Sequence, residues 1–473
     1  MSYRGKSVLV AGAGRSGVAA ARFLLSRGAR VTLTDIRPRE SLEPAVGGLE
    51  ELAARSGELA LELGGHREES FRRSDLVVVS PGIPLSLPLF DASRAAGVPV
   101  IAEVELAYRH IEGTLIGITG SNGKTTTTAL VAHLASAAGR RCRAAGNIGT
   151  PLIRYAEDSA PGDLYAVELS SFQLEAIDTF RPAIGAILNL TPDHLDRYAG
   201  FGEYVAAKQR LFMNQVDGDR AVLNADDART AAMAAAVHSR PVLFSRRRSL
   251  ERGAFVRGGR VLYRSDDGER DLFPVEAVGL VGAHNLENVL AACAMAILAG
   301  IPAEGLEAGV RAFRGVEHRI ELVAELDGVR YYNDSKATNV DATAKALESF
   351  PGNILLIAGG RDKEGDFASL RPLVRQRVRR LVVIGEAADK LRRALADVTA
   401  VSAAGSMEEA VSACRREAGP GDVVLLAPAC ASFDMFRDYE ERGRAFKEAV
   451  LAPHRGEEAG RRPGPCEEGF HGL

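Results

Sequence analysis

The feature that most constrains this chain is a glycine-containing loop between an apolar strand and a helix, running from Gly117 to Thr126 (GITGSNGKTT). Such a loop directs backbone N–H groups and a helix N-terminus at one point, which suits the terminal phosphates of a nucleotide. Lys124 would supply a positive charge, and the Thr125 hydroxyl a ligand for Mg²⁺. The spacing differs from the usual Walker pattern because Ile118 stands five positions before Gly123. A plain glycine turn with a solvated lysine is the alternative, but the strand before the turn and the helix after it favour a nucleotide loop.

Length and composition limit the class of protein. A chain of 473 residues is too long for one hydrophobic core, so two to four domains are expected. The 59 basic and 62 acidic residues are balanced, which predicts neither a nucleic-acid partner nor an acidic membrane surface. Five scattered cysteines without a CxxC pair favour a reducing compartment with unpaired thiols.

Targeting segments are not expected either. A strand begins within a few residues of the N-terminus and leaves no room for a signal peptide. The longest apolar run, Val289 to Ile301, is shorter than the roughly 20 residues of a membrane helix. We therefore expect a cytoplasmic protein that does not enter the membrane. Repeated alternation of apolar runs with helical stretches predicts an α/β fold with mostly parallel sheets. The segment 453–473, rich in Gly, Pro, Glu and Arg, is predicted to be a disordered tail.

The first 110 residues begin with a dinucleotide-type motif. A strand ending at Ala11 is followed by the glycines of a G-x-G-x-x-G motif, and a second strand ends at Asp35. Taken alone, this pattern fits a nicotinamide dehydrogenase, but a UDP-sugar satisfies the same geometry of a diphosphate and a hydroxylated sugar. A third strand leads into the turn Ser80 to Pro84, at the sheet edge where ligands bind, although ordinary loop chemistry also explains such a turn.

Two strands after the nucleotide loop deliver polar residues. The strand 164–167 ends in Glu168, which we expect beside the loop of Lys124, where a carboxylate can hold a cation bridging phosphate oxygens. The strand 184–188 leads into an Asn, Asp and His cluster from Asn189 to Tyr198, which is costly to bury unless it binds something. Within that cluster, His194 is a candidate second cation ligand.

Three further polar residues of this region have competing interpretations. Lys208 lies on an amphipathic helix, and from the residues alone a solvated lysine is favoured. Asn285 and Asn288 fall near the polar N-terminal turn of a helix predicted from Val289 to Leu298, where they either cap the helix or bind a purine.

The last third of the chain repeats the strand-and-loop arrangement. Strands at 321–326 and 329–332 precede a polar stretch, 333–339, that is typical of a binding loop. Strands at 353–358, 380–384 and 423–426 follow, and the turn after the last one is predicted to open a long helix containing Phe436, Tyr439 and Phe446. The turns meet at the carboxyl edge of a parallel sheet, which is the expected ligand side.

Together these motifs resemble the Mur ligases. The loop also resembles that of folylpolyglutamate synthetase, but the full set, in order from Val8 to Phe446, is most similar to the Mur ligases that add D-glutamate. The motifs are Gly120-Ser121-Asn122-Gly123-Lys124-Thr125-Thr126, Glu168-Leu169-Ser170-Ser171-Phe172-Gln173, Asp193-His194-Leu195-Asp196-Arg197-Tyr198, His284-Asn285 with Asn288, His318-Arg319, Asn333-Asp334-Ser335-Lys336-Ala337-Thr338-Asn339 and Pro428-Ala429-Cys430-Ala431-Ser432.

The resemblance implies three domains. They are a Rossmann-like UDP-sugar domain at 1–110, a central P-loop-type ATPase domain at 111–315 and a Rossmann-like amino-acid domain at 316–452. It also implies an ATP-dependent ligation of D-glutamate to the L-alanyl carboxylate of UDP-N-acetylmuramoyl-L-alanine through an acyl phosphate, by a monomer in peptidoglycan precursor synthesis. Another amino-acid-adding member remains open, as do the dehydrogenase and a nucleotide-binding regulator without catalytic activity.

The resemblance also assigns site residues by position. The UDP-sugar positions are Ser16, Asp35, Arg37, Ser80, Gly82, Asn147 and Gln173. The ATP positions are the loop residues Gly120, Ser121, Asn122, Gly123, Lys124, Thr125 and Thr126 with Asn285, Asn288, Arg319, Asp334 and Lys336. The D-glutamate positions are Lys336, Thr338, Lys363, Ser432 and Phe433.

For the chemistry, the resemblance implies Lys124, Glu168, His194 and Lys208 as catalytic positions. It implies two Mg²⁺ ions at Thr125, Glu168, His194 and Lys208, with Lys208 carbamoylated, which overturns the solvated interpretation of that lysine. Ile36, Phe433 and Tyr439 depart from the usual family residues and are expected to alter pocket shape rather than the reaction.

Overall fold

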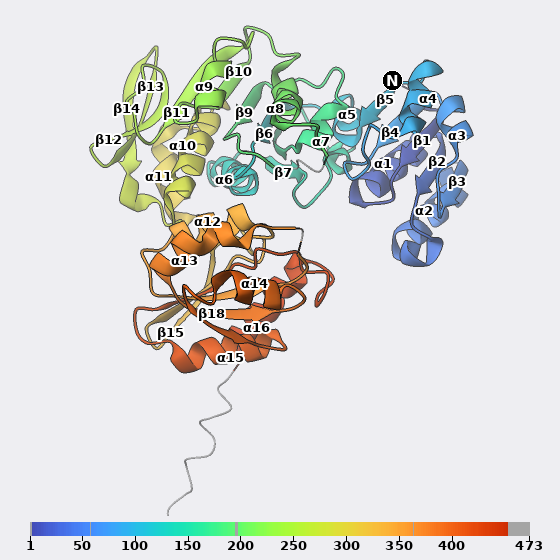
Figure 1. The fold of residues 1–473 in the computed structure, drawn as a ribbon. Coiled ribbons are helices and arrows are strands. Elements are labelled where there is room, and N and C mark those ends of the chain that lie inside the picture. Colours follow the sequence, from blue (N-terminus) through green and yellow to red (C-terminus); the bar gives the residue numbers. More distant parts are fainter. Residues whose placement is uncertain (1, 57, 194–196, 363, 453–473) are drawn as a thin grey trace, which may run out of the picture. The chain divides into compact units, whose positions relative to one another are not determined.

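The computed structural model describes residues 2–56, 58–193, 197–362 and 364–452 (Figure 1). The chain divides into two compact units, one reaching Arg314 and the other beginning at Gly315. Within the described residues, the first unit contains two sheets and the second unit one, and all three are mostly parallel. The predicted α/β class is therefore confirmed. The predicted tail 453–473, His194 and Lys363 lie outside the described residues.

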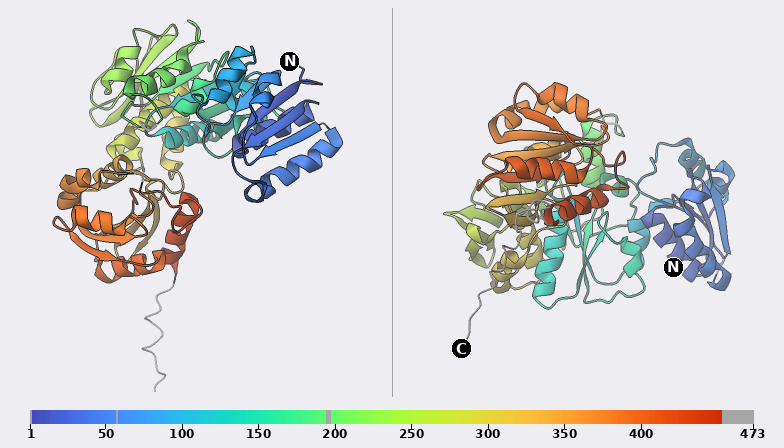
Figure 2. Two further views of the ribbon diagram at one scale, coloured as in Figure 1. Left: turned by 45° about the vertical axis from the view of Figure 1, so that its right-hand side comes forward. Right: turned by 90° about the horizontal axis from the view of Figure 1, so that it is seen from below.

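The first sheet has five parallel strands in the order β3-β2-β1-β4-β5. The strands are β1 (Ser7–Ala11), β2 (Arg30–Asp35), β3 (Glu58–Leu63), β4 (Leu76–Val79) and β5 (Val100–Ala102). The helices around it are α1 (Arg15–Ser26), α2 (Glu43–Ser56), α3 (Glu68–Arg73) and α4 (Pro88–Ala95). Helices α1 and α2 cover one face and α3 and α4 the other (Figure 2), and apart from Ser7 at the start of β1 the residues of β1 and β4 are apolar and buried. The strand order reverses between β1 and β4, which creates a ligand crevice there.

The second sheet has nine strands in the order β14-β13-β12-β11-β10-β9-β6-β8-β7. The parallel part comprises β6 (Thr114–Thr119), β7 (Cys142–Gly146), β8 (Leu164–Glu168), β9 (Ile184–Ile187), β10 (Arg220–Asn224), β11 (Arg240–Ser245) and β12 (Gly253–Arg257). An antiparallel edge is formed by β13 (Arg260–Ser265) and β14 (Gly268–Pro274). Strand β6 lies between β9 and β8, so the loop after β6 and the residue that ends β8 meet at one sheet edge.

The helices of the second sheet place the lysines predicted for catalysis. They are α6 (Lys124–Ala137), α7 (Ser171–Glu175), α8 (Phe201–Gln209), α9 (Ala228–Met233), α10 (Ala283–Leu298) and α11 (Leu306–Ala312). Helices α6 and α10 pack side by side, and α7 packs against α8. Helix α6 begins at Lys124 and α8 carries Lys208 near its end, as predicted.

Helix α5 (Glu103–Tyr108) joins the two sheets of the first unit through its two buried glutamates. Glu103 Oε1 accepts a hydrogen bond of 2.7 Å from the Ile153 backbone N–H. Glu105 accepts backbone N–H bonds from Asp178 and Phe180 at 2.9 and 2.7 Å. The hydrophobic core is continuous from the first sheet into the second, which accounts for their clustering in one unit.

Replacement of Glu103 by glutamine is expected to reduce the pH dependence of unfolding. Burial raises the pKa of Glu103 to about 7 from an ordinary 4.5, although the Ile153 N–H opposes the shift. Because the folded protein keeps a proton that the unfolded chain releases, this group lowers the free energy of unfolding as pH rises through that window. Glutamine still accepts from Ile153 but cannot ionise. The free energy of unfolding of E103Q minus that of the wild type should therefore be larger at pH 8 than at pH 4.

Urea denaturation of both proteins at the two pH values measures this difference. The matched control is Glu112→Gln, because Glu112 is exposed in the same unit. A stability difference between E103Q and wild type that is independent of pH would argue that Glu103 does not retain its proton on folding.

The sheet of the second unit has the order β15-β16-β20-β17-β18-β19, with β15 antiparallel. The strands are β15 (Glu321–Leu326), β16 (Val329–Asn333), β17 (Ile354–Gly359), β18 (Val378–Ile384), β19 (Ala400–Ala403) and β20 (Val423–Leu426). The helices are α12 (Val340–Glu348), α13 (Arg371–Arg377), α14 (Ala388–Leu395), α15 (Met407–Glu417) and α16 (Tyr439–Leu451). Helices α12, α13 and α14 lie on one face and α15 and α16 on the other (Figure 1).

One helix start was predicted wrongly. Phe436 lies before α16, because the Asp438 carboxylate accepts the Glu441 backbone N–H at 2.7 Å and fixes the N-terminus of the helix there. Among the described helices, none is both long enough and apolar enough to cross a bilayer.

Candidate active site

The glycine loop after β6 has the geometry of a phosphate-binding turn. Gly123 caps α6 with a φ of 83°, and a Cβ at this position would lie 2.2 Å from Asn288 Oδ1, so a side chain would strain the backbone and displace Asn288. Lys124 Nζ donates to the backbone oxygens of Gly120 and Ser121 at 2.8 and 2.9 Å. The ammonium group is thereby folded back over the loop, at the positive end of a 14-residue helix.

The polar cluster after β9 holds this loop in place. Asn189 Oδ1 accepts the Asn122 backbone N–H at 2.8 Å, and Ser121 Oγ donates to the Thr191 carbonyl at 2.8 Å. Part of the cluster that sequence analysis connected with ligand binding therefore has a structural use. His194 itself lies outside the described residues.

Glu168 ends β8 at the same edge, and its two carboxylate oxygens differ. Oε1 accepts a hydrogen bond of 2.8 Å from Asn147 Nδ2. Oε2 is buried, and no described residue donates a hydrogen bond to it. A buried carboxylate oxygen without a donor is unfavourable in the protein alone, and a cation would satisfy it. Glu168 therefore fits the metal position that the sequence predicted.

Lys208 is not solvated, so the interpretation from the residues alone is wrong. Its side chain is 1% exposed. Nζ donates to Gly120 O at 3.0 Å and Thr119 Oγ1 at 3.2 Å, and it lies 4.6 Å from the ring centre of Tyr204. Burial, reinforced by the positive charge of Lys124, holds the pKa of Lys208 well below its ordinary value. Because only the neutral amine is nucleophilic, this environment makes Lys208 more nucleophilic than an exposed lysine.

Asn285 lies in the first turn of α10 and Asn288 in the second, and neither caps the helix. Gly282 is the N-cap residue, without a capping side chain. Asn285 Nδ2 donates backwards to the Val281 carbonyl at 2.7 Å, and Asn288 Nδ2 donates to Asn285 Oδ1 at 3.1 Å. The capping interpretation is therefore wrong. Asn288 contacts Gly123 of the phosphate loop, which connects the start of α10 with that loop.

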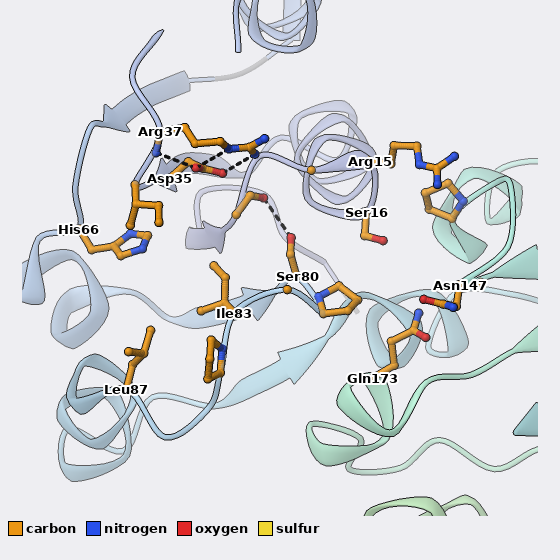
Figure 3. Close-up of a pocket in the computed structure, with 18 of the residues that line it drawn as sticks. Arg15, Ser16, Asp35, Arg37, His66, Ser80, Ile83, Leu87, Asn147 and Gln173 are labelled. Atoms are coloured by element: carbon orange, nitrogen blue, oxygen red, sulfur yellow. Dashed lines mark hydrogen bonds and ion pairs between the residues drawn. The ribbon is translucent and has the colours of Figure 1, made fainter. Parts of the chain in front are cut away.

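A cavity of about 680 Å³ opens beside this edge (Figure 3). All the residues predicted for the UDP-sugar line it, namely Ser16, Asp35, Arg37, Ser80, Gly82, Asn147 and Gln173. They come from the start of α1 and the ends of β2 and β4 around the first sheet, and from the loop after β7 and helix α7 of the second. Sequence analysis missed His66 and Leu87, which line the end away from Gln173 in Figure 3, whereas Ile83 beside them belongs to the turn predicted at the ligand edge.

Asp35 and Arg37 form a fixed pair in this cavity. Asp35 Oδ1 accepts from Arg37 Nε at 2.9 Å, and Oδ2 accepts from Arg37 Nη2 and the Ala13 backbone N–H, both at 2.8 Å. These Arg37 hydrogen bonds hold the pKa of Asp35 well below its usual range. Because both oxygens are occupied, the carboxylate fixes the arginine and the glycine turn in addition to any contact with a sugar.

The remaining predicted residues lie in the second unit, after β16 and β20 and, for Arg319, just before β15. Arg319 stands between two residues with positive φ, His318 at 64° and Ile320 at 43°. The Ile320 N–H donates to Asp334 Oδ1 at 3.3 Å. Burial raises the pKa of Asp334 to about 7, against the opposing charge of Arg319. Strain of this kind persists where the surroundings fix the backbone, as here around Arg319.

The predicted D-glutamate residues occupy the same edge. Lys336 Nζ lies 3.6 Å from the ring centre of Tyr439, and the Thr338 N–H donates to the Lys336 carbonyl at 2.8 Å. Ser432 is buried and Phe433 is 61% exposed. Lys363 lies outside the described residues.

Arg442 was missed by sequence analysis, yet it joins the loops of this edge. It is 1% exposed, and its Nε and Nη2 donate to Ser335 Oγ and Ser335 O at 3.0 and 2.8 Å. Nη1 donates to the carbonyls of Cys430 and Ala431 at 3.1 and 3.2 Å. Burial lowers the pKa of Arg442 to about 10, so the guanidinium stays charged at neutral pH. The one sequence signal was its place in a helix that follows a ligand loop.

Replacement of Arg442 by methionine is expected to destabilise the second unit by at least about 3 kcal/mol, because several buried carbonyls lose their donor. The exposed Arg444, two positions further along α16, provides the matched control Arg444→Met. Chemical denaturation of the full chain measures both variants. Equal stability of the two would contradict the structural role of Arg442.

The sequence matches three domain families. They are described as Mur ligase MurD-like, N-terminal domain (residues 6–102), Mur ligase middle domain (residues 118–296) and Mur ligase, glutamate ligase domain (residues 318–430). The chain is 50% identical over 458 residues to a UDP-N-acetylmuramoylalanine--D-glutamate ligase of Acidobacterium capsulatum, covering 96% of this chain and 98% of that protein. It is 48% identical over 457 residues to the protein of that name from Geobacter metallireducens, covering 97% and 100%.

Solved structures share the fold at low sequence identity. MurF ligase from Thermotoga maritima, determined in complex with ADP, has a TM-score of 0.59 at 15% identity, covering 89% of this chain and 95% of that chain. UDP-N-acetylmuramate-alanine ligase MurC from Thermotoga maritima has a TM-score of 0.58 at 18% identity, covering 94% and 99%.

Proposed function

The chain belongs to the Mur ligase family, and we propose that it joins D-glutamate to the L-alanyl carboxylate of UDP-N-acetylmuramoyl-L-alanine with ATP as the energy source. The names of the relatives that the chain matches along nearly its whole length support this choice of substrates. The structural observation that carries the proposal is the Asn147–Glu168 hydrogen bond. Asn147 lines the cavity and Glu168 lies beside the phosphate loop, so one contact links the two sites.

A carboxylate cannot react directly with an amine to form an amide, because oxide is too poor a leaving group. The first step therefore gives the carboxylate a better leaving group. The L-alanyl carboxylate attacks the γ-phosphorus of ATP, the bond between that phosphorus and the β,γ-bridging oxygen breaks, and an acyl phosphate and ADP form. Two anions must approach for this reaction. At about 4 Å and an effective dielectric constant near 20, each pair of unit charges repels by roughly 4 kcal/mol. Lys124, at the start of α6, offsets part of that repulsion.

Divalent metal would be held by Thr125, Glu168, His194 and a modified Lys208, and the buried Oε2 of Glu168 fits such a ligand set. When bound, Mg²⁺ neutralises phosphate charge and aligns the reacting groups. We propose two ions, as in the family resemblance.

Lys208 is proposed to be a carbamate in the active enzyme. A neutral amine adds to CO₂, forming an N–C bond and releasing one proton, and the product is an anion. The lowered pKa of the buried Lys208 amine supports this reaction, because it increases the fraction of neutral amine. A carbamate beside Lys124 would be attracted by that charge, whereas a protonated Lys208 would be repelled by it.

In the second step the amine of D-glutamate attacks the acyl phosphate carbonyl, and inorganic phosphate leaves as the amide forms. His194 is proposed to orient or deprotonate that amine. Lys336, Thr338, Lys363, Ser432 and Phe433 are proposed to bind D-glutamate. The nucleotide is proposed to contact Gly120 to Thr126, Asn285, Asn288, Arg319, Asp334 and Lys336.

The same proposal assigns the UDP-sugar to residues 1–110, ATP to residues 111–315 and the amino acid to residues 316–452. We propose a cytoplasmic monomer that acts on small molecules without a nucleic-acid or membrane partner. The balanced charge of the sequence supports this description.

A phosphate-release assay tests the function. Purified protein receives ATP, Mg²⁺ and UDP-N-acetylmuramoyl-L-alanine with a panel of D- and L-amino acids. Of the amino acids in the panel, only D-glutamate is expected to give phosphate release above background. Release with a different amino acid would point to another Mur ligase activity. Absence of release together with oxidation of NAD(P)H on offered carbonyl substrates would favour the dehydrogenase.

A further inference from the structure

Arg197 occupies a position that the proposed chemistry does not use. It follows the Asp193-to-Asp196 motif directly and is largely buried. Its Nη1 donates to the Pro81 carbonyl at 3.0 Å, and Nη2 donates to the Ile83 carbonyl at 3.4 Å and to Glu175 Oε2 at 3.1 Å. One guanidinium group therefore contacts the turn after β4 in the first sheet and helix α7 beside the second sheet.

The guanidinium is fixed on its face as well as on its edge. It lies 3.8 Å from the ring centre of Phe172, and Tyr198 stacks on Phe172 with ring centres 6.1 Å apart. The Tyr198 hydroxyl also donates to Glu175. A planar, charged group that donates on one side and stacks on the other leaves its two carbonyl partners little freedom to move.

Both contacted segments form walls of the UDP-sugar cavity. Pro81 and Ile83 belong to the turn that lines it from the first sheet. Gln173, on the same short helix α7 as Phe172 and Glu175, lines it from the second (Figure 3). Arg197 thus connects the two walls, and a shift of either would change the width of the cavity.

We propose that Arg197 is a positioning residue that sets the separation of these walls for a nucleoside-diphosphate sugar, a role that rests on the proposed function. In this proposal the UDP-sugar contacts Ser16 or Asp35 on one wall and Asn147 or Gln173 on the other. Its binding energy therefore depends on that separation. The nucleotide loop is anchored separately by Asn189 and is not expected to respond.

Isothermal titration of the full chain with UDP-N-acetylmuramoyl-L-alanine, without ATP, tests the role. Arg197→Met is expected to raise the Kd at least about tenfold, because two charge-assisted bonds to the turn are lost. Arg197→Lys keeps the charge but not the planar fork, and should give an intermediate Kd. The control Arg181→Met removes an arginine that pairs with Asp219 and does not line the cavity, and should stay within about twofold of wild type.

Steady-state kinetics separate positioning from general damage. The KM for the UDP-sugar should rise with the Kd, while the KM values for ATP and D-glutamate stay unchanged. An unchanged Kd in Arg197→Met, or an equal rise of all three KM values, would overturn the proposal. Failure of the wild-type protein to bind the UDP-sugar would instead overturn the proposed function.

Thermal melting identifies a variant that does not fold. In that case Glu175→Gln provides the test, because it removes the negative partner of Arg197 at nearly constant size. It should weaken UDP-sugar binding at least about threefold. Unaltered binding in a folded Glu175→Gln protein would also count against the role of Arg197.

Discussion

Lys124→Ala is expected to lower ATP-dependent phosphate release by at least about a thousandfold, measured with UDP-N-acetylmuramoyl-L-alanine and D-glutamate both present. The ammonium group lies over the loop on the carbonyls of Gly120 and Ser121, at the N-terminus of α6. This ammonium group would stabilise the negative charge of phosphate oxygens bound there. The stabilisation matters most when the substrate carboxylate approaches the γ-phosphate. Without the Lys124 charge, less of the repulsion between the carboxylate and the γ-phosphate is offset.

The same variant should keep its fold and its affinity for the UDP-sugar. Asn189 and Thr191 still hold the loop through Asn122 and Ser121, and none of the residues lining the cavity is altered. Titration with the UDP-sugar and a thermal melt therefore serve as internal controls, and Lys6→Ala, at an exposed lysine of the same unit, is the matched substitution. An unimpaired rate in folded Lys124→Ala would remove the assignment of this loop to ATP.

The sheet edges were predictable because parallel strands place their carboxyl ends together. The strands around Glu168 and the phosphate loop were recognisable from apolar runs followed by glycine or polar turns, and β8 does lie beside β6. The same rule brought Asp35 and Ser80 together across β1. Local pattern and topology were sufficient for these positions.

The roles of Lys208 and Arg442 could not be predicted because they depend on tertiary packing. The sequence of its helix predicts a surface position for Lys208. Its burial follows from the packing of α8 over the end of β6, where Lys208 donates to Thr119. Arg442 is hidden in the same way, because it joins the preceding loop at Cys430 to Ser335, which is distant in sequence. The start of α16 was different, since Asp438 followed by Glu441 is a recognisable capping signal that was overlooked.

Lys208→Ala is the second substitution with a large expected effect, a loss of activity of at least about a hundredfold that short carboxylic acids such as acetate partly restore. The truncation leaves a space in a closed environment between Thr119, Gly120 and Tyr204, where a small carboxylate can enter. Lys208→Arg keeps a positive charge, fills the space and cannot form the carbamate. It should be inactive and insensitive to added acids.

The carbamate also changes which groups Lys208 can contact. As an ammonium, Nζ donates to Gly120 O, the same carbonyl that Lys124 uses. Carbamate oxygens only accept hydrogen bonds, so they would turn away from that carbonyl toward Lys124 and toward a cation held by Glu168. Labelling with ¹³CO₂ should give a carbamate resonance in wild type that is absent from Lys208→Ala. Full activity of untreated Lys208→Ala would mean that the buried amine serves packing alone.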